Sequence, residues 1–123
     1  MITLYGIKTC DTCRKALKWL DGEGIAHRYH DLRVDGLTAA QVSAWVKARG
    51  WESVLNRRST TWRDLPEAVR SGLDAKTAAA LMVEHPTLIK RPVIETGKEI
   101  LIGFDTATRA ALVRRDPSAS SPA

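Results

Sequence analysis

The stretch from Ile2 to Leu20, ITLYGIKTCDTCRKALKWL, decides the fold that we expect for this chain. Its first four residues form a short apolar run that ends at Gly6, a pattern typical of a β-strand. From Cys13 to Leu20, apolar residues recur at helical spacing while charged residues take the opposite face. This helix should end near Gly22 or Gly24, because glycine commonly follows the last helical turn. The stretch therefore predicts a strand and then a helix.

Three later segments complete a small sheet around this strand. Residues 25–30 alternate in polarity and predict a second strand, which a right-handed crossover would place parallel to the first. Residues 93–95 and 100–102 flank a turn at residues 96–98 and predict an antiparallel hairpin. Asp105 can cap a last helix. This order of elements predicts an α/β protein with a thioredoxin-like fold, in which a small mixed sheet is flanked by helices.

The middle of the chain carries helix signals. Thr38 and Gln41 have the spacing of a capping box, which predicts a helix that runs to about Arg49. Asp74 can cap another helix, which should stop before Pro86 because the residue preceding a proline disfavours helical geometry. The middle of the chain is therefore expected to be helical.

The segments between these helices are less regular. Residues 51–55 suggest one short helical turn, and residues 56–62 show no clear period and are expected to form a loop. We expect one domain over residues 1–113 with a helical insertion at about 38–85. Residues 114–123 are small, polar and proline-bearing, which predicts a disordered tail.

The composition limits the function classes. The chain has 123 residues, enough for one core, and a formal net charge of +5 that is scattered along the sequence. No run of five basic residues occurs, so we expect a few specific anion contacts. No apolar run reaches the roughly 18 residues of a membrane span, and two cysteines exclude a disulfide-rich secreted scaffold. We expect a cytoplasmic protein, with a monomer as the default.

Four tryptophans stand in or beside helical apolar positions, namely Trp19, Trp45, Trp51 and Trp62. Aromatic residues at such positions are more often core than base-stacking platforms, so direct nucleic-acid binding is not expected. Trp62 is the exception, since it follows the loop with Arg57 and Arg58 and could flank a binding pocket.

Cys10 and Cys13 form a C-x-x-C pair at the start of the first expected helix. Unpaired N–H groups at a helix N-terminus favour the thiolate, and Lys8 nearby adds positive potential, so we expect Cys10 to have a lowered pKa and to be the nucleophile. Cys13 lies one turn further and could attack a mixed disulfide on Cys10. The alternative for Cys13 is a small buried apolar residue of the helix.

A zinc site is a weaker interpretation of the same cysteines. Together with His27 and His30 they give C-x2-C-x13-H-x2-H, which superficially resembles a zinc finger. The histidines are closer together than the usual three to five intervening residues, and on a strand they would point to opposite faces. We therefore expect no metal site.

Two arginines are candidates for binding an anionic substrate together with the helix N-terminus. Arg57 and Arg91 each offer a planar fork suited to carboxylates and oxyanions. Arg91 precedes Pro92, and thioredoxin-like folds keep a cis-proline at the start of the strand that faces the C-x-x-C pair. By this analogy with the fold, we expect Pro92 to be cis and to present backbone to the substrate.

Six segments share the order and spacing of one known family: Leu4-Tyr5-Gly6, Cys10 to Ala16, Asp35-Gly36-Leu37, Gly50-Trp51, Leu55-Asn56-Arg57 with Thr60-Thr61-Trp62-Arg63, and Ile89 to Pro92. Over residues 1–112 the chain resembles the arsenate-reductase-like (ArsC) family, above all its YffB-type subgroup of glutathione-dependent thiol reductases. The resemblance implies Cys10 as nucleophile, Arg57 and Arg91 as oxyanion-binding residues, and glutathione as co-substrate without a tightly bound cofactor.

Two departures from the family pattern bear on the substrate. Glutaredoxin-coupled arsenate reductases carry a third arginine after the last hairpin strand, where this chain has Ile102-Gly103-Phe104-Asp105. An oxyanion product would lose that ligand, which argues against arsenate. The Cys13 position is also non-cysteine in many close relatives, and C-x-x-C-R-K-A is similar to the Spx-type regulators of the same family, which bind the RNA polymerase α-subunit.

The sequence thus supports three hypotheses. The first is a thiol oxidoreductase that acts on a glutathionylated, disulfide or oxyanion substrate, with glutathione and glutaredoxin as partners. The second is a redox-sensitive regulator that binds the RNA polymerase α-subunit. The third is a true arsenate reductase, which shares the mechanism of the first and differs in its substrate.

Overall fold

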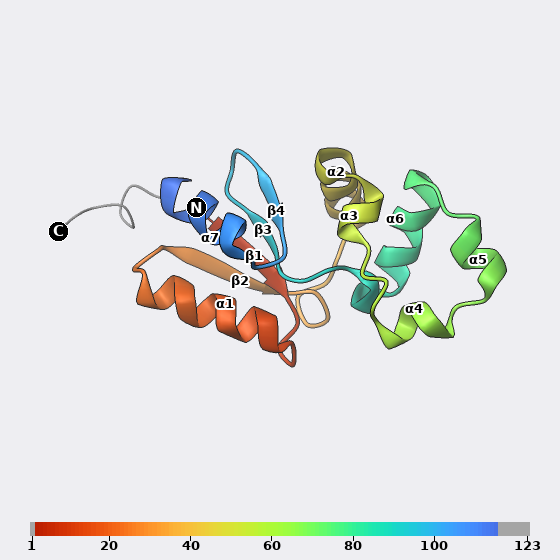
Figure 1. The fold of residues 1–123 in the computed structure, drawn as a ribbon, viewed down its shortest axis with the longest axis horizontal. Coiled ribbons are helices and arrows are strands. Elements are labelled where there is room, and N and C mark those ends of the chain that lie inside the picture. Colours follow the sequence, from red (N-terminus) through yellow and green to blue (C-terminus); the bar gives the residue numbers. More distant parts are fainter. Residues whose placement is uncertain (1, 116–123) are drawn as a thin grey trace. The chain divides into compact units, whose positions relative to one another are not determined.

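The computed structural model describes residues 2–115, which separate into two compact units. One unit contains residues 2–34 and 91–115, and the other contains residues 35–90. Their helices and strands are labelled in Figure 1. The expected helical insertion at about 38–85 falls inside the second unit, while the expectation of a single domain over 1–113 stays a prediction. Of the expected tail, residues 116–123 lie outside the described residues.

The first unit is built on a four-stranded mixed sheet in the order β2-β1-β3-β4. Strand β1 (Ile2–Gly6) pairs in parallel with β2 (His27–Asp31) and antiparallel with β3 (Val93–Glu95). Strand β3 continues antiparallel into β4 (Ile100–Ile102). The parallel crossover and the hairpin expected from the sequence are both confirmed, and this unit has the expected thioredoxin-like arrangement of a mixed sheet with flanking helices.

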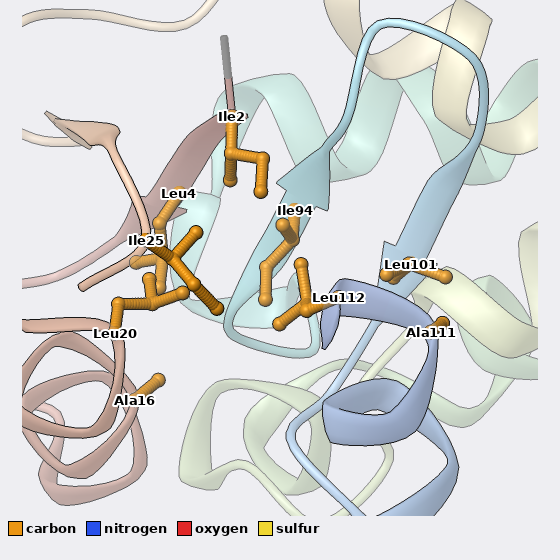
Figure 2. Close-up of a cluster of buried hydrophobic side chains, with 9 residues drawn as sticks. All are labelled: Ile2, Leu4, Ala16, Leu20, Ile25, Ile94, Leu101, Ala111 and Leu112. Carbon is orange, nitrogen blue, oxygen red and sulfur yellow. The ribbon is translucent and has the colours of Figure 1, made fainter. Parts of the chain in front are cut away.

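One apolar core holds this sheet to its two helices, α1 (Asp11–Gly22) and α7 (Thr106–Arg115). Leu4, Ile94 and Leu101 are paired across three strands and therefore share one face of the sheet. Figure 2 shows the buried side chains of this cluster pointing toward one another from β1, β3, β4 and both helices: Ile2, Leu4, Ala16, Leu20, Ile25, Ile94, Leu101, Ala111 and Leu112. Burial of this apolar surface holds α1 and α7 against the sheet.

The cap of the last helix follows the sequence. Asp105 accepts a hydrogen bond from the backbone N–H of Thr108 at 2.8 Å, which begins α7 as expected. The helix continues to Arg115, so residues 114 and 115, expected in the tail, are helical. Helix ends fray gradually, and composition alone does not set the last turn.

The second unit is helical. It contains α2 (Ala39–Arg49), α3 (Trp51–Val54), α4 (Thr60–Asp64), α5 (Glu67–Ser71), α6 (Ala75–Glu84) and a 3₁₀ turn, η1 (Pro86–Leu88). Both predicted caps are confirmed, because Thr38 with Gln41 and Asp74 with Thr77 each form a reciprocal capping box. Trp45 and Met82 are fully buried in its core, which confirms a packing role for that tryptophan.

One prediction for this unit is wrong. The segment 56–62 was expected to be a loop, but helix α4 begins at Thr60. The Ser59 side chain caps it by accepting a hydrogen bond from the backbone N–H of Trp62 at 3.1 Å. A helix of five residues is too short to show a 3.6-residue period, so the cap is its main sequence signal.

Among residues 2–115, no helix is long and apolar enough to span a membrane.

Candidate functional site

Cys10 lies at the junction of a turn and helix α1. Its backbone N–H donates to the Ile7 carbonyl at 2.9 Å, which closes a turn from the end of β1. Cys10 is the N-cap residue of α1, with extended backbone (φ −82°, ψ 118°), and its carbonyl accepts the first helical hydrogen bond, from Arg14 at 3.1 Å. The half-buried thiol therefore sits where the helix has unpaired N–H groups. The placement expected from the sequence is confirmed.

Two opposing influences act on the Cys10 thiol. Burial raises its pKa, but interactions with the backbone N–H and thiol of Cys13 and with the Arg91 guanidinium lower it, and the lowering influences win. The net effect is that the pKa of Cys10 lies below the ordinary value for a cysteine. A lower pKa leaves more thiolate at neutral pH, and the thiolate is the form that attacks disulfides.

Cys13 has the opposite character, although it is only three residues away. Its side chain is 1% exposed, and burial raises the pKa of its thiol to about 12. Gly6 makes this position available, because a Cβ on Gly6 would lie 2.5 Å from the Cys13 sulfur. The two thiols are free and do not form a disulfide. The sequence pattern identifies Gly6 only as the end of a strand. Its close approach to Cys13 is evident only in the structure.

Arg91 and Pro92 bring a cation and a backbone bend to the same unit. The Arg91–Pro92 peptide bond is cis, as the analogy predicted, and the Pro92 carbonyl accepts from the Gly103 N–H at 2.8 Å. The Nε and Nη1 atoms of Arg91 are buried and have no hydrogen-bond partner within the described chain. Buried guanidinium donors without partners are costly, so this arginine is suited to receive an anion.

Lys8 lies in the turn before Cys10, and its backbone rather than its side chain is fixed. Its N–H donates to the Asp31 carboxylate at 2.9 Å, and its side chain is exposed. The Lys8 ammonium is therefore a surface charge, in contrast to the partly buried guanidinium of Arg91. Asp31 is a further residue that the sequence patterns missed.

Arg57 belongs to the second unit, where aromatic rings hold it. Its guanidinium carbon lies 5.7 Å from the centre of the Trp51 ring and 6.0 Å from that of Trp62. Its Nη2 atom is 3.7 Å from a Glu52 carboxylate oxygen, and half of the side chain is exposed. Trp62 therefore lies close to Arg57, and the expectation that it flanks a binding pocket stays a prediction.

A cavity of about 260 Å³ opens beside this arginine. The residues that line it are Leu55, Asn56, Arg57, Arg58 and Lys90, so three cations and no carboxylate face it. The Lys90 N–H donates to the Val54 carbonyl at 2.7 Å, which ties the end of this unit to α3. The cavity is suited to a small anionic group.

Four of the six predicted site residues lie in the sheet unit and have fixed contacts there: Cys10, Cys13, Arg91 and Pro92. Lys8 is in the same unit with its side chain toward solvent, and Arg57 is in the helical unit. The histidines of the zinc interpretation have other contacts, since His27 Nδ1 lies 2.8 Å from the Ile25 carbonyl and His30 stacks on Tyr5. Within residues 2–115 no group of three or more His, Cys, Asp or Glu could hold a metal ion.

Known proteins match this chain over most of its length. The ArsC family model matches residues 5–112. An uncharacterized protein of Haemophilus influenzae is 51% identical over 105 residues, which cover 85% of this chain and 92% of that protein. The solved structure of a YFFB protein is 43% identical with a TM-score of 0.86, covering 91% of this chain and 98% of that one. The global transcriptional regulator Spx of Streptococcus agalactiae is 30% identical over 118 residues, covering 94% and 85%.

Proposed function

This chain belongs to the ArsC family, and from that premise we propose that it is a thiol-dependent oxidoreductase with Cys10 as its nucleophile. The observation that carries the proposal is the setting of Cys10 at the N-cap of α1 beside Arg91, which lowers the pKa of the thiol. Two buried donors of that same arginine have no partner among residues 2–115. A reactive thiol beside a cation with unused donors suits a substrate that carries a negative charge.

In the first step, the Cys10 thiolate attacks the glutathione sulfur of a glutathionylated substrate. A bond forms between Cys10 Sγ and that sulfur, and the original sulfur–sulfur bond breaks. The electron pair of the broken bond leaves on the substrate sulfur, which takes up a proton from water. The substrate is thereby reduced, and Cys10 carries glutathione as a mixed disulfide.

In the second step, the thiolate of another glutathione attacks the mixed disulfide, forming glutathione disulfide and releasing the Cys10 thiolate. Burial of Cys13 and the high pKa of its thiol support this route over attack by Cys13. Cys13 then serves as a neutral neighbour whose thiol stabilises the Cys10 thiolate, in accord with its lowering effect on that pKa.

Arg91 is proposed to hold the anionic part of the substrate next to Cys10 through Nε and Nη1. Carboxylates of glutathione match such a planar pair of donors. Arg57 is proposed to bind an anionic group from the cavity of its own unit, where Trp51 and Trp62 restrict the guanidinium. Pro92 is proposed to offer backbone to the substrate beside Arg91.

Turnover of a glutathionylated peptide, with glutathione and glutathione reductase recycling the product, tests the proposal. We expect Cys10→Ser to abolish turnover and the matched Cys13→Ser to retain it within about tenfold, the cost of one neutral hydrogen bond. Absence of turnover in the unaltered protein, or full activity in Cys10→Ser, would contradict the proposed function. Arsenate supplied as an alternative substrate in the same coupled assay tests the arsenate-reductase hypothesis, which turnover of arsenate would support.

A regulator is the second candidate function. The Streptococcus agalactiae relative is named a global transcriptional regulator, and this chain carries a C-x-x-C pair at positions 10 and 13. Pull-down of purified RNA polymerase α-subunit with the reduced and the oxidised protein distinguishes this candidate. Binding that changes with oxidation and is lost in Cys10→Ser would support a regulator, and equal absence of binding in both states would reject it.

A further inference from the structure

Asp31, at the end of β2, is a buried carboxyl group that the proposed reaction does not use. It is 5% exposed. Carboxylates are seldom buried unless other groups compensate for the lost water, because desolvation of a charge is costly. The compensation at Asp31 is therefore informative about what the residue does.

Four donors surround this carboxylate. Oδ2 accepts from the Lys8 backbone N–H at 2.9 Å and from the Tyr29 hydroxyl at 3.0 Å. Oδ1 accepts from the backbone N–H groups of Arg33 at 2.8 Å and Val34 at 3.1 Å. Burial raises the pKa of Asp31, but these hydrogen bonds together lower it by more. The net pKa is below the ordinary value, so the group is a carboxylate at neutral pH.

The bond to Lys8 reaches the turn that delivers Cys10. Lys8 is the second residue of that turn, which the hydrogen bond from Cys10 N–H to the Ile7 carbonyl closes. A further backbone bond, from Leu32 N–H to the Gly6 carbonyl at 2.9 Å, joins the same two segments. Asp31 thus connects the chain after β2 to the chain between β1 and α1.

We propose that Asp31 is a positioning residue for the Cys10 thiol: its carboxylate holds the Ile7–Cys10 turn so that the sulfur stays at the N-cap of α1 beside Arg91. The proposal rests on Cys10 being the reactive thiol. It assigns to a buried acid at a strand end a role in nucleophile reactivity, which acts through the backbone of Lys8 and requires no contact with substrate.

A carboxylate is the side chain that this arrangement needs. Both oxygens accept, and three of the four donors are backbone N–H groups. Asparagine has one acceptor oxygen, and its NH2 group would face a backbone donor at the other position. Loss of the Lys8 bond would free the turn, so the sulfur would spend less time near Arg91 and the N-terminal N–H groups that favour its thiolate.

The sharpest test compares Lys8→Pro with Lys8→Ala by the pH dependence of Cys10 alkylation with iodoacetamide. Both variants lose the lysine charge, but only proline removes the N–H that Asp31 accepts. Proline is also favoured at the second position of a turn, so the turn itself is preserved. We expect the midpoint for Lys8→Pro to lie at least about half a pH unit above that for Lys8→Ala, a roughly threefold loss of thiolate at pH values below both midpoints.

Asp31→Asn supplies a second variant, with Tyr29→Phe as its control. Tyr29→Phe removes a bond to the carboxylate that does not involve the turn, so its midpoint should stay at that of the unaltered protein. Asp31→Asn should raise the midpoint as Lys8→Pro does. Unfolding by urea identifies variants that fail to fold, and for those the Lys8 pair alone decides.

The outcomes separate this inference from the proposed function. Equal midpoints for Lys8→Pro and Lys8→Ala, or an unshifted midpoint in folded Asp31→Asn, would overturn the positioning role while leaving a reactive Cys10. An ordinary midpoint in the unaltered protein would instead contradict the proposed nucleophile itself.

Discussion

Each of the two units contains an arginine that we propose to bind an anion, and the surroundings of the two arginines differ. In the sheet unit, Arg91 is half-buried beside the thiol, and its buried Nε and Nη1 atoms have no hydrogen-bond partner within residues 2–115. In the helical unit, Arg57 is half exposed, stacks near two tryptophans and has a carboxylate neighbour. Water and neighbours satisfy the exposed arginine in the absence of ligand, whereas the buried one needs the ligand to complete its hydrogen bonds. From this difference in burial we expect Arg91 to affect the chemistry of Cys10 and Arg57 to affect only substrate affinity.

The largest effect of burial should appear within the sheet unit, at Cys13. With its pKa at about 12, roughly one thiol in 10⁵ is ionised at pH 7. Cys10 also raises the pKa of Cys13 and is lost in Cys10→Ser, but burial, the larger cause, remains. We therefore expect the folded Cys10→Ser protein to react with iodoacetamide at least about 10²-fold more slowly than Cys10 reacts in the unaltered protein. Labelling of the same variant in denaturant should restore an ordinary rate. Fast labelling of the native variant would show that Cys13 is accessible and would weaken the comparison.

Arg91→Ala should give the next largest effect. It removes a cation that lowers the Cys10 pKa and the donors proposed for the substrate. Hydrogen bonds to charged groups contribute about 1.5–3 kcal/mol, so kcat/KM should fall roughly 10- to 100-fold and the midpoint of Cys10 alkylation should rise. A loss of kcat/KM with no shift of that midpoint would assign Arg91 to substrate binding alone.

Gly6→Ala should destabilise the same unit by steric conflict. The new Cβ would lie 2.5 Å from the Cys13 sulfur, and overpacking of this kind costs about 1–3 kcal/mol. Gly22→Ala is the matched control in α1, because a Cβ there has no neighbour within 4 Å. Replacing a helical glycine should stabilise by about 0.5–1 kcal/mol. Urea unfolding checks both signs, and equal stability of the two variants would refute the tight packing at Gly6.

Arg57→Ala should give the smallest effect on the chemistry. It should raise KM for an anionic substrate up to about tenfold, the scale of one exposed charged contact with aromatic support. The pH midpoint of Cys10 alkylation should not move, in contrast to Arg91→Ala. Steady-state kinetics and alkylation measured on the same preparation decide this, and a shifted midpoint would mean that both arginines act on the thiol.

Much of the fold could be predicted because its signals are local. The strand up to Gly6, the helix after Cys10 and the hairpin of β3 and β4 each carry their own polarity period and turn residues. The capping box at Thr38 and the cap at Asp105 also depend on neighbours in the sequence. Helix α4 escaped prediction because one turn carries almost no periodic signal.

The candidate site also contains residues that could be predicted from their sequence neighbours and residues that could not. The position of Cys10 at a helix start follows from adjacent residues, and so does the C-x-x-C spacing. The family resemblance, rather than local physics, pointed to Arg57, Arg91 and Pro92. The roles of Gly6 and Asp31 could not be predicted, because each depends on a contact with a residue elsewhere in the chain.

The sequence by itself placed both cysteines on one turn at the start of one helix, which predicts a single reactive centre. Only the tertiary structure decided how the two thiols differ. Identical side chains acquire different pKa values when one is buried against Gly6 and the other lies beside Arg91. Desolvation and charge proximity depend on which distant segments pack together, and that information is absent from the spacing of residues along the chain.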